Sequence, residues 1–203
     1  MTKLFITGIG TDIGKTVVSA ILVEKLKADY WKPVQSGDLD HSDTIKVKAL
    51  VSNQVSLFHP ESYRLNRPLS PNHSAKIDGI RIDPSRIVLP ESTNKYLIIE
   101  GAGGLMVPLN YEYLVIDLAS DLKAEIILVS KAYLGSINHT LLSIEAIKQR
   151  NLPLRGIVFN GNPNPESEDV ILEYSGVKCI GRIPEAAHLD KNFVSGCGSL
   201  IEI

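Results

Sequence analysis

Residues 4–26 read LFITGIGTDIGKTVVSAILVEKL, which is a short apolar run, a cluster of glycines and a long segment rich in apolar residues. The common phosphate-binding loop has the spacing G-x-x-x-x-G-K-[ST]. Measured back from Gly14, that spacing requires a glycine where Ile9 stands. Gly8 lies one residue too far from Gly14, and Gly10 lies one residue too near. The stretch is therefore either a phosphate loop of unusual spacing or a chance cluster of glycines.

The context of these glycines favours the phosphate loop. They follow a predicted strand over residues 4–7 and lead directly into a predicted helix over residues 15–27. Backbone N–H groups at a helix N-terminus carry partial positive charge and bind phosphates. Lys15 adds a point charge for the β and γ phosphates, and the hydroxyl of Thr16 can bind Mg²⁺. We therefore expect a nucleotide site here and not a plain turn.

Short apolar runs alternate with amphipathic segments along the whole chain, which predicts α/β architecture. Several of the runs are continuous Ile, Leu and Val, as expected of strands covered on both faces. We expect one domain over residues 1–203, with a mostly parallel sheet, helices on both faces and a fold like that of the P-loop NTPases. The predicted strands cover residues 4–7, 30–34, 96–100, 125–130, 154–160 and 177–183, and the predicted helices cover 15–27, 44–51, 137–150 and 167–174.

The least regular part of the sequence is the segment 52–94, which is rich in Pro, Asn, Ser and Arg. A segment of this kind is consistent with a lid or insertion beside a ligand. It is equally consistent with a surface excursion packed on the domain.

The composition excludes several classes of protein. The chain has 203 residues, 44% of them hydrophobic and 22% charged, and its net charge is −2, which gives no long-range attraction to nucleic acid or anionic membranes. The cysteines Cys179 and Cys197 are too few for a disulfide framework and form no C-x-x-C metal motif. No apolar run approaches the length of a membrane span or a signal peptide. We expect a cytoplasmic protein with small-molecule partners and no nucleic-acid or membrane partner.

The unusual spacing of the glycine loop is itself informative. The loop GIGTDIGKT, residues 8–16, resembles that of the dethiobiotin synthetases, which typically reads G-T-D-T-x-[VI]-G-K-T. The residues that match this pattern are Gly8, Thr11, Ile13, Gly14, Lys15 and Thr16, whereas Ile9 and Gly10 replace the usual Thr and Asp. The related partition-type ATPases carry a signature lysine at the position of Gly10. The resemblance therefore favours the synthetases.

The segment WKPVQSG, residues 31–37, places Lys32 before a proline at the carboxyl end of a predicted strand. Proline biases the residue before it to extended backbone, and ligands of open α/β sheets collect at that edge. From the residues alone, a solvated lysine at a strand end is the preferred interpretation. The segment resembles the K-P-V-x-S-G segment of the dethiobiotin synthetases. The resemblance implies that Lys32 is the principal catalytic lysine and that Ser36 contacts the substrate.

Two acidic residues are candidate metal ligands, and Asp38 and Asp40 are nearby alternatives to the first of them. Asp43, in HSDTIKVKAL, precedes a predicted helix, where an acid ordinarily caps the N-terminus. Glu100 ends the apolar strand of YLIIEGAGG, and small residues follow it that let the backbone approach a ligand. A carboxylate in that position suits a metal beside phosphates. The E-G-A-G-G segment matches the family unchanged, and the resemblance implies that Thr16, Asp43 and Glu100 bind Mg²⁺ and the nucleotide.

Three later segments resemble other parts of the same family. GIVFNGNP ends a predicted strand at Asn160, whose amide suits an adenine edge, although Asn-Gly is equally a turn. GRIPEA, residues 181–186, resembles the family's second base-side segment. LGSINHT, residues 134–140, opens a predicted helix whose free N–H groups could hold a carboxylate. The resemblance implies that this helix start lies at a homodimer interface and binds the substrate's acid tail through Gly135 and Asn138.

The resemblance extends along nearly the whole chain and implies an ATP- and Mg²⁺-dependent ligase. Such an enzyme would convert 7,8-diaminononanoate and CO₂ into dethiobiotin through a carbamate and a carbamic–phosphoric anhydride. The implied catalytic residues are Thr11, Lys15 and Lys32. The implied ATP contacts are Asp12, Ile13, Gly14, Lys15, Thr16, Val17, Asp43, Glu100, Gly101, Ala102, Gly103, Asn160, Gly161, Pro184, Glu185 and Ala186.

One segment departs from the family pattern, and two other functions are open to a chain with a loop of this kind. LSPNHSA, residues 69–75, has Asn72 where the family usually has His. A partition-type ATPase switch is disfavoured by Gly10. An ATP-dependent amidotransferase of the cobyrinate type would need a glutaminase domain with a reactive Cys and His, for which 203 residues leave no room.

Overall fold

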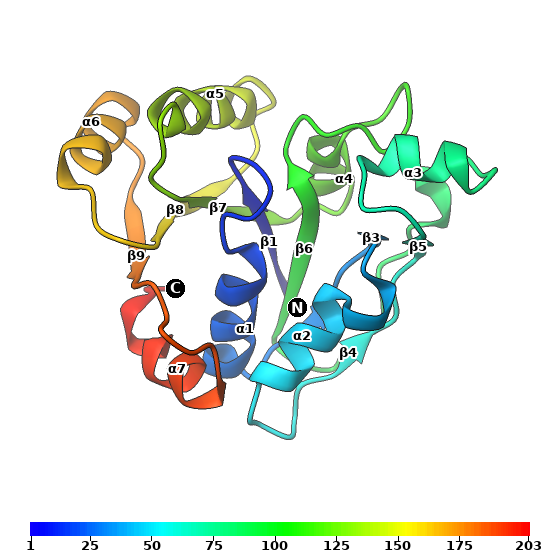
Figure 1. Cartoon of the computed structure of the whole chain (residues 1–203), viewed down its shortest axis with the longest axis horizontal. Helices are drawn as coiled ribbons and strands as arrows, with labels where there is room; N and C mark the ends of the chain where they lie inside the picture. Colours follow the sequence, from blue (N-terminus) through cyan, green and yellow to red (C-terminus); the bar gives the residue numbers. More distant parts are fainter.

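The computed structural model describes residues 1–203 and is built on a seven-stranded sheet in the order β4-β2-β6-β1-β7-β8-β9 (Figure 1). All neighbouring strands of this sheet pair in parallel. A separate sheet consists of the parallel pair β3 and β5. The strands are β1 Thr2–Gly8, β2 Asp29–Trp31, β3 Val34–Ser36, β4 Phe58–His59, β5 Tyr63–Leu65, β6 Tyr96–Gly104, β7 Glu125–Ser130, β8 Leu154–Asn160 and β9 Cys179–Ile183. The predicted parallel α/β architecture is confirmed.

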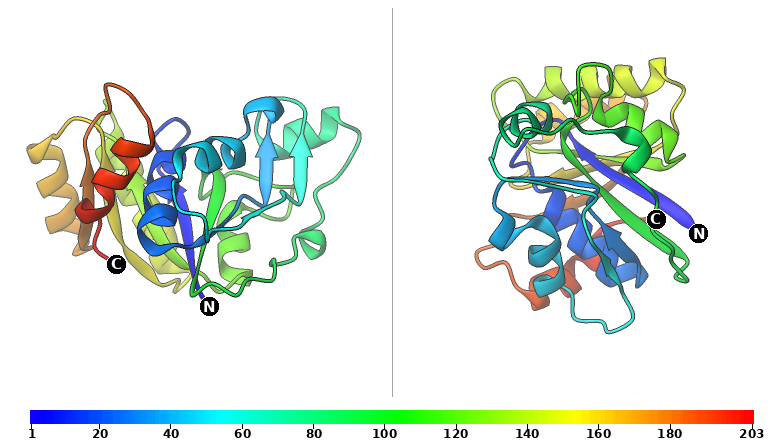
Figure 2. Two further views of the ribbon diagram at one scale, coloured as in Figure 1. Left: turned by 90° about the horizontal axis from the view of Figure 1, so that it is seen from below. Right: turned by 90° about the vertical axis from the view of Figure 1, so that its right-hand side faces the viewer.

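Helices cover both faces of the main sheet, as Figures 1 and 2 show. On β1, Leu4 and Ile6 pack into the apolar cluster beneath α1, α2 and α7, whereas Phe5 packs into the cluster beneath α4 and α5. Both faces of the strand are therefore buried, which accounts for its continuous apolar run. The helices are α1 Lys15–Leu26, α2 Asp43–Leu50, α3 Pro71–Ile77, α4 Val115–Asp121, α5 Ser136–Gln149, α6 Pro165–Ser175 and α7 Lys191–Gly196, with short 3₁₀ helices at Leu39–His41, Pro84–Arg86 and Cys197–Leu200. No helix is long and apolar enough to cross a membrane.

The predicted strand over residues 30–34 is wrong, because the structure divides it in two. β2 ends at Trp31 in the main sheet, and the chain then leaves that sheet to form β3, which pairs with β5. The break falls at Lys32 and Pro33, since proline has no N–H to continue a ladder. The carbonyl of Pro33 instead accepts a hydrogen bond from the backbone N–H of Tyr63 at 3.0 Å. This break places Lys32 at the end of β2, at the carboxyl edge of the sheet.

The segment 52–94 contains the edge strand β4, the strand β5 and the helix α3. Asp29, which is fully buried, anchors both ends of the segment. Its carboxylate accepts hydrogen bonds from the N–H of Leu57 at 2.8 Å and from Asn94 Nδ2 at 2.6 Å. The segment is thus packed on the domain, and α3 lies against β3 and β5. Its middle part, residues 68–71, lines the cavity described below.

Candidate active site

The glycine loop joins β1 to α1 and depends on glycine at specific positions. Gly14 has φ +96°, and a Cβ there would lie 2.1 Å from Nδ2 of Asn160. A Cβ on Gly8 would lie 1.9 Å from Cδ1 of Ile13, which is buried under the loop. No such restriction applies to Gly10, where a Cβ would meet nothing within 4 Å. The cluster of glycines is therefore a shaped turn between strand and helix, as the phosphate-loop interpretation requires.

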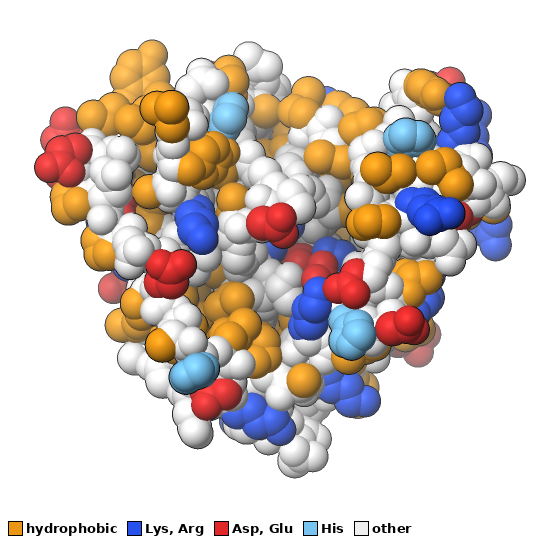
Figure 3. All heavy atoms as spheres, in the orientation of Figure 1, with side chains coloured by type: hydrophobic (Ala, Val, Ile, Leu, Met, Phe, Trp, Pro, Cys, Tyr) orange, Lys and Arg blue, Asp and Glu red, His pale blue; other side chains and the backbone are white.

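A cavity of about 660 Å³ opens over this loop at the carboxyl edge of the sheet. Figure 3 shows acidic and basic side chains gathered around a hollow on this face of the molecule. Of the residues predicted for the site, those that line the cavity are Thr11, Asp12, Gly14, Lys15, Thr16, Val17, Lys32, Ser36, Asp43, Glu100, Ala102 and Gly103. Ile13 and Gly101 do not line it: Ile13 is 3% exposed in the core, and Gly101 packs against Phe5.

The structure also brings to this cavity residues that were not predicted. They are Val34, Gln35, Lys46, Pro68, Leu69, Ser70, Pro71 and Val107. The side chain of Gln35 accepts a hydrogen bond from the N–H of Asp43 at 3.2 Å, which fixes the start of α2. Ser36 donates to the carbonyls of Arg67 and Leu69 at 3.0 and 2.8 Å, which holds the 68–71 wall against the cavity. The contacts of Ser36 join segments about thirty residues apart in sequence, for which local patterns give no signal.

The ammonium group of Lys32 lies between two carboxylates. Its Nζ is 2.6 Å from Oδ2 of Asp43 and 3.2 Å from Oε1 of Glu100. The side chains of Lys32 and Glu100 are 5% and 1% exposed, so this ion pair is largely withdrawn from water. Thr16 donates from Oγ1 to Oε1 of Glu100 at 3.0 Å, and Tyr30 donates to Oε2 at 2.9 Å. The structure therefore brings Thr16, Asp43 and Glu100, from α1, α2 and β6, together around Lys32 at the end of β2. Lys32 is buried and paired, so the interpretation of it as a solvated lysine is wrong.

Burial and charge act in opposite directions on the pKa values of these groups. Burial by itself lowers the pKa of Lys32, but Glu100 and Asp43 outweigh it, so the pKa of Lys32 is raised. Burial likewise raises the pKa of Asp43, but Lys32 outweighs it and the pKa of Asp43 is lowered. For Lys15 burial is the largest effect and lowers the pKa, and the positive charge of the nearby Lys32 lowers it further. Burial, with Glu100 beside it, raises the pKa of the Tyr30 phenol well above its usual range.

Lys15 is turned back onto its own loop. Its Nζ donates to the carbonyl of Gly10 at 2.8 Å, across the turn that would hold phosphates. The residue is 7% exposed and lies close enough to Lys32 for their charges to interact. Two buried ammonium groups thus face the same cavity, one from the start of α1 and one from the end of β2.

The oxygen donors at this edge fit a magnesium ion. Thr16, Asp43 and Glu100 supply one hydroxyl and two carboxylates, and the two carboxylates already converge on one positive charge, that of Lys32. No group of three or more His, Cys, Asp or Glu side chains is placed to hold a metal on its own. Mg²⁺ is commonly bound through one or two carboxylates together with phosphate oxygens and water. The donor set therefore suits Mg²⁺ bound with a nucleotide.

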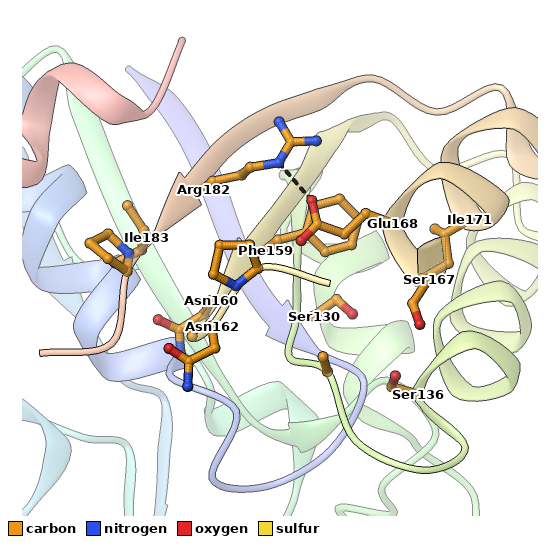
Figure 4. A pocket seen from close by; sticks show the side chains of 14 residues that line it. Ser130, Ser136, Phe159, Asn160, Asn162, Ser167, Glu168, Ile171, Arg182 and Ile183 are labelled. Atoms are coloured by element: carbon orange, nitrogen blue, oxygen red, sulfur yellow. Dashed lines mark hydrogen bonds and ion pairs between the residues drawn. The ribbon is translucent and has the colours of Figure 1, made fainter. Parts of the chain in front are cut away.

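A second cavity, of about 200 Å³, lies beyond the loop under the β8–α6 connection (Figure 4). Asn160, Gly161 and Pro184 line it, as predicted for the base side of the site. Asn160 also donates from Nδ2 to the carbonyl of Ile13 at 2.9 Å, which ties the end of β8 to the phosphate loop. On the far wall Arg182 pairs with Glu168 at 2.6 Å. The predicted base contacts Glu185 and Ala186 do not line this cavity, and Glu185 instead accepts from Asn162 Nδ2 at 2.8 Å.

The start of α5 does not line the main cavity of its own chain. Gly135, with φ +100°, precedes the helix, and both it and Asn138 are exposed. A cavity of about 380 Å³ lies beside them, between the phosphate loop, the end of β6 and the α5 side chains His139, Leu142 and Ser143. The predicted carboxylate site is thus near the loop but open to the surface.

Comparison with known proteins gives close relatives along most of the chain. A family model described as an AAA domain matches residues 2–192. A protein of Christiangramia forsetii named ATP-dependent dethiobiotin synthetase BioD is 56% identical over 94% of this chain and 91% of its own length. A protein of the same name from Cytophaga hutchinsonii is 48% identical over 96% of this chain and 94% of its own.

Solved structures show a likeness of fold at low sequence identity. The cell division ATPase MinD of Pyrococcus furiosus superposes with a TM-score of 0.63 at 16% identity, over 98% of both chains. A ParA family ATPase of Chlorobium tepidum superposes with a TM-score of 0.57 at 14% identity, over 98% of this chain and 92% of that one. These matches support the predicted P-loop NTPase fold.

Proposed function

The chain belongs to the ATP-dependent dethiobiotin synthetases and is accordingly a ligase, and on this premise we propose how its site carries out the reaction. One amine of 7,8-diaminononanoate attacks CO₂ and loses a proton to give a carbamate anion. A carbamate oxygen then attacks the γ-phosphorus of ATP, the bond to the β,γ-bridging oxygen breaks, and ADP leaves. The second amine attacks the carbamoyl carbon and loses a proton. Phosphate leaves with the former carbamate oxygen, and the cyclic urea is closed.

The observation that carries this proposal is the placement of Lys32. Its ammonium group is buried beside the phosphate loop and is held in the charged form by Asp43 and Glu100. A carbamate and a γ-phosphate are both anions and repel one another unless a cation lies between them. Lys32 and Lys15 face the same cavity from different elements, so they would place positive charge where these two anions must meet. Thr11 lines the same wall and would donate its hydroxyl to the carbamate.

We propose that Thr16, Asp43 and Glu100 hold Mg²⁺ together with the nucleotide phosphates. When bound, the ion neutralises charge on the phosphates and on the leaving ADP. Lys15 would give up its contact with the Gly10 carbonyl and bind phosphate oxygens, since the loop has no other lysine.

The anhydride must be kept from water until the second amine attacks it. Pro68, Leu69 and Pro71 form a largely apolar part of the cavity wall, and Ser36 fixes this wall through the carbonyls of Arg67 and Leu69. We propose that this wall excludes water from the anhydride. The proposed role of Ser36 is therefore to position this wall as well as to contact the substrate.

We further propose that the active unit is a homodimer in which Gly135 and Asn138 of one subunit bind the substrate carboxylate of the other. The support is that both residues are exposed and that large apolar side chains surround them. Leu134 is fully exposed, and Leu142 and Met106 are more than half exposed. Leu142 and Met106 also line the 380 Å³ cavity beside the phosphate loop. A second copy seated here would cover these side chains and bring a helix start to the substrate.

The two other functions considered lack support at the site. The likeness to MinD and ParA proteins is one of fold, and Gly10 stands where the partition-type ATPases carry their signature lysine. An amidotransferase would need a reactive thiolate, but Cys197 lies in the core, where burial raises the pKa of its thiol, and the thiol of Cys179 donates to the carbonyl of Gly181.

Incubation of the protein with Mg²⁺, ATP, bicarbonate and 7,8-diaminononanoate should release ADP only when the diamine is present, and dethiobiotin should accumulate in equal amount. ADP release that is independent of the diamine would indicate a switch-type ATPase. ADP release that requires glutamine would indicate an amidotransferase.

A further inference from the structure

Tyr30 makes a contact at the site that the proposed reaction does not use. Its hydroxyl donates to Oε2 of Glu100 at 2.9 Å, and the two residues are 0% and 1% exposed. On β2, Tyr30 pairs in parallel with Ile98 of β6, so it lies on the same face of the sheet as Glu100, two residues further along. The tyrosine ring packs against Phe58 with 6.2 Å between ring centroids. Strand pairing and packing therefore aim the phenol at one oxygen of the carboxylate.

The contacts of Glu100 are divided between its two oxygens. Oε2 accepts from Tyr30, which lies beneath it in the sheet. Oε1 accepts from Thr16 at 3.0 Å and from Lys32 at 3.2 Å, and both of these residues line the cavity over the phosphate loop. A phenol at neutral pH is a hydrogen-bond donor and occupies the oxygen that it contacts. Oε1 is therefore the oxygen that faces the cavity, and a metal bound there would replace the contacts that Thr16 and Lys32 make with it.

We propose that Tyr30 is a positioning residue that restricts Glu100 to coordination through one oxygen and thereby selects Mg²⁺ over Ca²⁺. This inference rests on the proposed metal site of Thr16, Asp43 and Glu100. Mg²⁺ requires a compact octahedral shell, for which a carboxylate supplies one oxygen. Ca²⁺ takes about six to eight oxygens and often binds both oxygens of a carboxylate. A hydrogen bond from the phenol to Oε2 would therefore disfavour the binding of Ca²⁺ through both oxygens of Glu100. It would leave the binding of Mg²⁺ through one oxygen unchanged.

The alternative is that Tyr30 is a core tyrosine whose hydroxyl finds a partner and does nothing more. Both interpretations predict some loss of stability when the hydroxyl is removed. They differ in the metal preference, which a purely structural contact would leave unchanged. Tyr63 provides a matched control, because it is also buried and its hydroxyl bonds to the backbone of Asp83 and to none of the predicted metal ligands.

The test is calorimetric titration of Mg²⁺ and of Ca²⁺ into the protein saturated with a non-hydrolysable ATP analogue, with the analogue alone as the blank. Loss of a group that orients a metal ligand typically weakens metal binding by about 10–100-fold. Tyr30→Phe should weaken Mg²⁺ binding within that range and Ca²⁺ binding by less, because Oε2 becomes free to bind Ca²⁺. The ratio of the Ca²⁺ to the Mg²⁺ dissociation constant should therefore fall. Tyr63→Phe should leave this ratio at its wild-type value.

An unchanged ratio in a folded Tyr30→Phe protein would overturn the inference. Glu100→Gln separates this failure from failure of the metal site itself: if that variant binds Mg²⁺ as the wild type does, Glu100 is not a ligand at all. Should Tyr30→Phe fail to fold, infrared difference spectra of the wild type on addition of Mg²⁺ give the same information. Carboxylate bands assigned by their loss in Glu100→Gln should show one-oxygen coordination, and two-oxygen coordination would contradict the proposal.

Discussion

At Lys32, a single side chain is subject to two opposing influences. Burial disfavours its charged form, and the carboxylates of Asp43 and Glu100, at 2.6 and 3.2 Å, more than offset that effect. The lysine therefore keeps its charge in a place poor in water, where a charge interacts more strongly with its neighbours than it does in solvent. Lys46, 3.9 Å from Asp43 and about half exposed, lines the same cavity without such burial.

Lys32→Gln should bind ATP with near-normal affinity but close the ring far more slowly. The reason is that Lys32 meets the γ-phosphate mainly where the carbamate faces it, so its charge matters most in the transition state. Loss of one such contact typically costs about 2.7–4 kcal/mol, or on the order of a hundred- to a thousandfold in rate. The measurements are ATP binding by calorimetry, which also reports that the variant is folded, and single-turnover formation of dethiobiotin.

Lys46→Gln is the matched control, because it removes the same charge from the exposed side of the same cavity, and its effect on the rate should be small. If Lys32→Gln closes the ring at close to the wild-type rate, Lys32 is not a catalytic residue.

Among the elements, the turn from β1 to α1 depends on a backbone conformation that only glycine adopts without strain. Gly14 has φ +96°, and Asn160 lies across it while donating to the carbonyl of Ile13. Gly10, in the same turn, has open space where a side chain would be. The turn therefore has room for a methyl group at Gly10 but not at Gly14.

Gly14→Ala should lower the free energy of unfolding by about 1–3 kcal/mol, the usual cost of a non-glycine residue in a strained conformation. It should also weaken ATP binding, because the displaced Asn160 would no longer hold the loop. Gly10→Ala should change neither quantity appreciably. Denaturant unfolding and calorimetric ATP titration of the two variants give the comparison. Equal effects of the two substitutions would show that the conformation of Gly14 is unimportant.

Where local pattern and tertiary structure agree, the elements follow from the sequence. β7 and β8 have the predicted bounds, because each contains apolar residues buried on both faces, 126–129 in β7 and 157–159 in β8. The break in the predicted strand 30–34 could have been anticipated from Pro33, which has no N–H to continue a ladder. The short helices α4 Val115–Asp121 and α7 Lys191–Gly196 were not predicted, since seven and six residues are too few to show a helical period.

The candidate site was predictable to the extent that it follows from parallel strands. Lys32 and Glu100 each end a predicted strand, which places both at the carboxyl edge of the sheet, but only the family resemblance assigned Lys32 to the site. The contact of Tyr30 with Glu100 was not predicted, since it depends on the pairing of Tyr30 with Ile98. Strand order and register are properties of the assembled sheet and do not appear in the local sequence of either strand.

For the whole molecule, the proposed dimer makes a prediction about mixed subunits. In the proposed dimer each site combines Lys32 of one subunit with Asn138 of its partner. A heterodimer of a Lys32→Gln subunit and an Asn138→Asp subunit then has one site with both changes and one site with neither. The heterodimer should therefore recover activity that both parent homodimers lack. Activity is measured on heterodimers purified with two different tags. No recovery would show that Lys32 and Asn138 act within one subunit, and an active Asn138→Asp homodimer would show that Asn138 has no role.

The central claim is that this molecule activates a carbamate with ATP, so that an oxygen of CO₂ is transferred to phosphate. A single-turnover reaction with ¹⁸O-labelled CO₂, stopped before the label exchanges with water, tests it directly. Mass spectrometry of the released phosphate should find one ¹⁸O in each phosphate, formed together with dethiobiotin. Phosphate without ¹⁸O from CO₂, released while dethiobiotin forms, would contradict the account, because the carbamate oxygen would then not have attacked the γ-phosphorus.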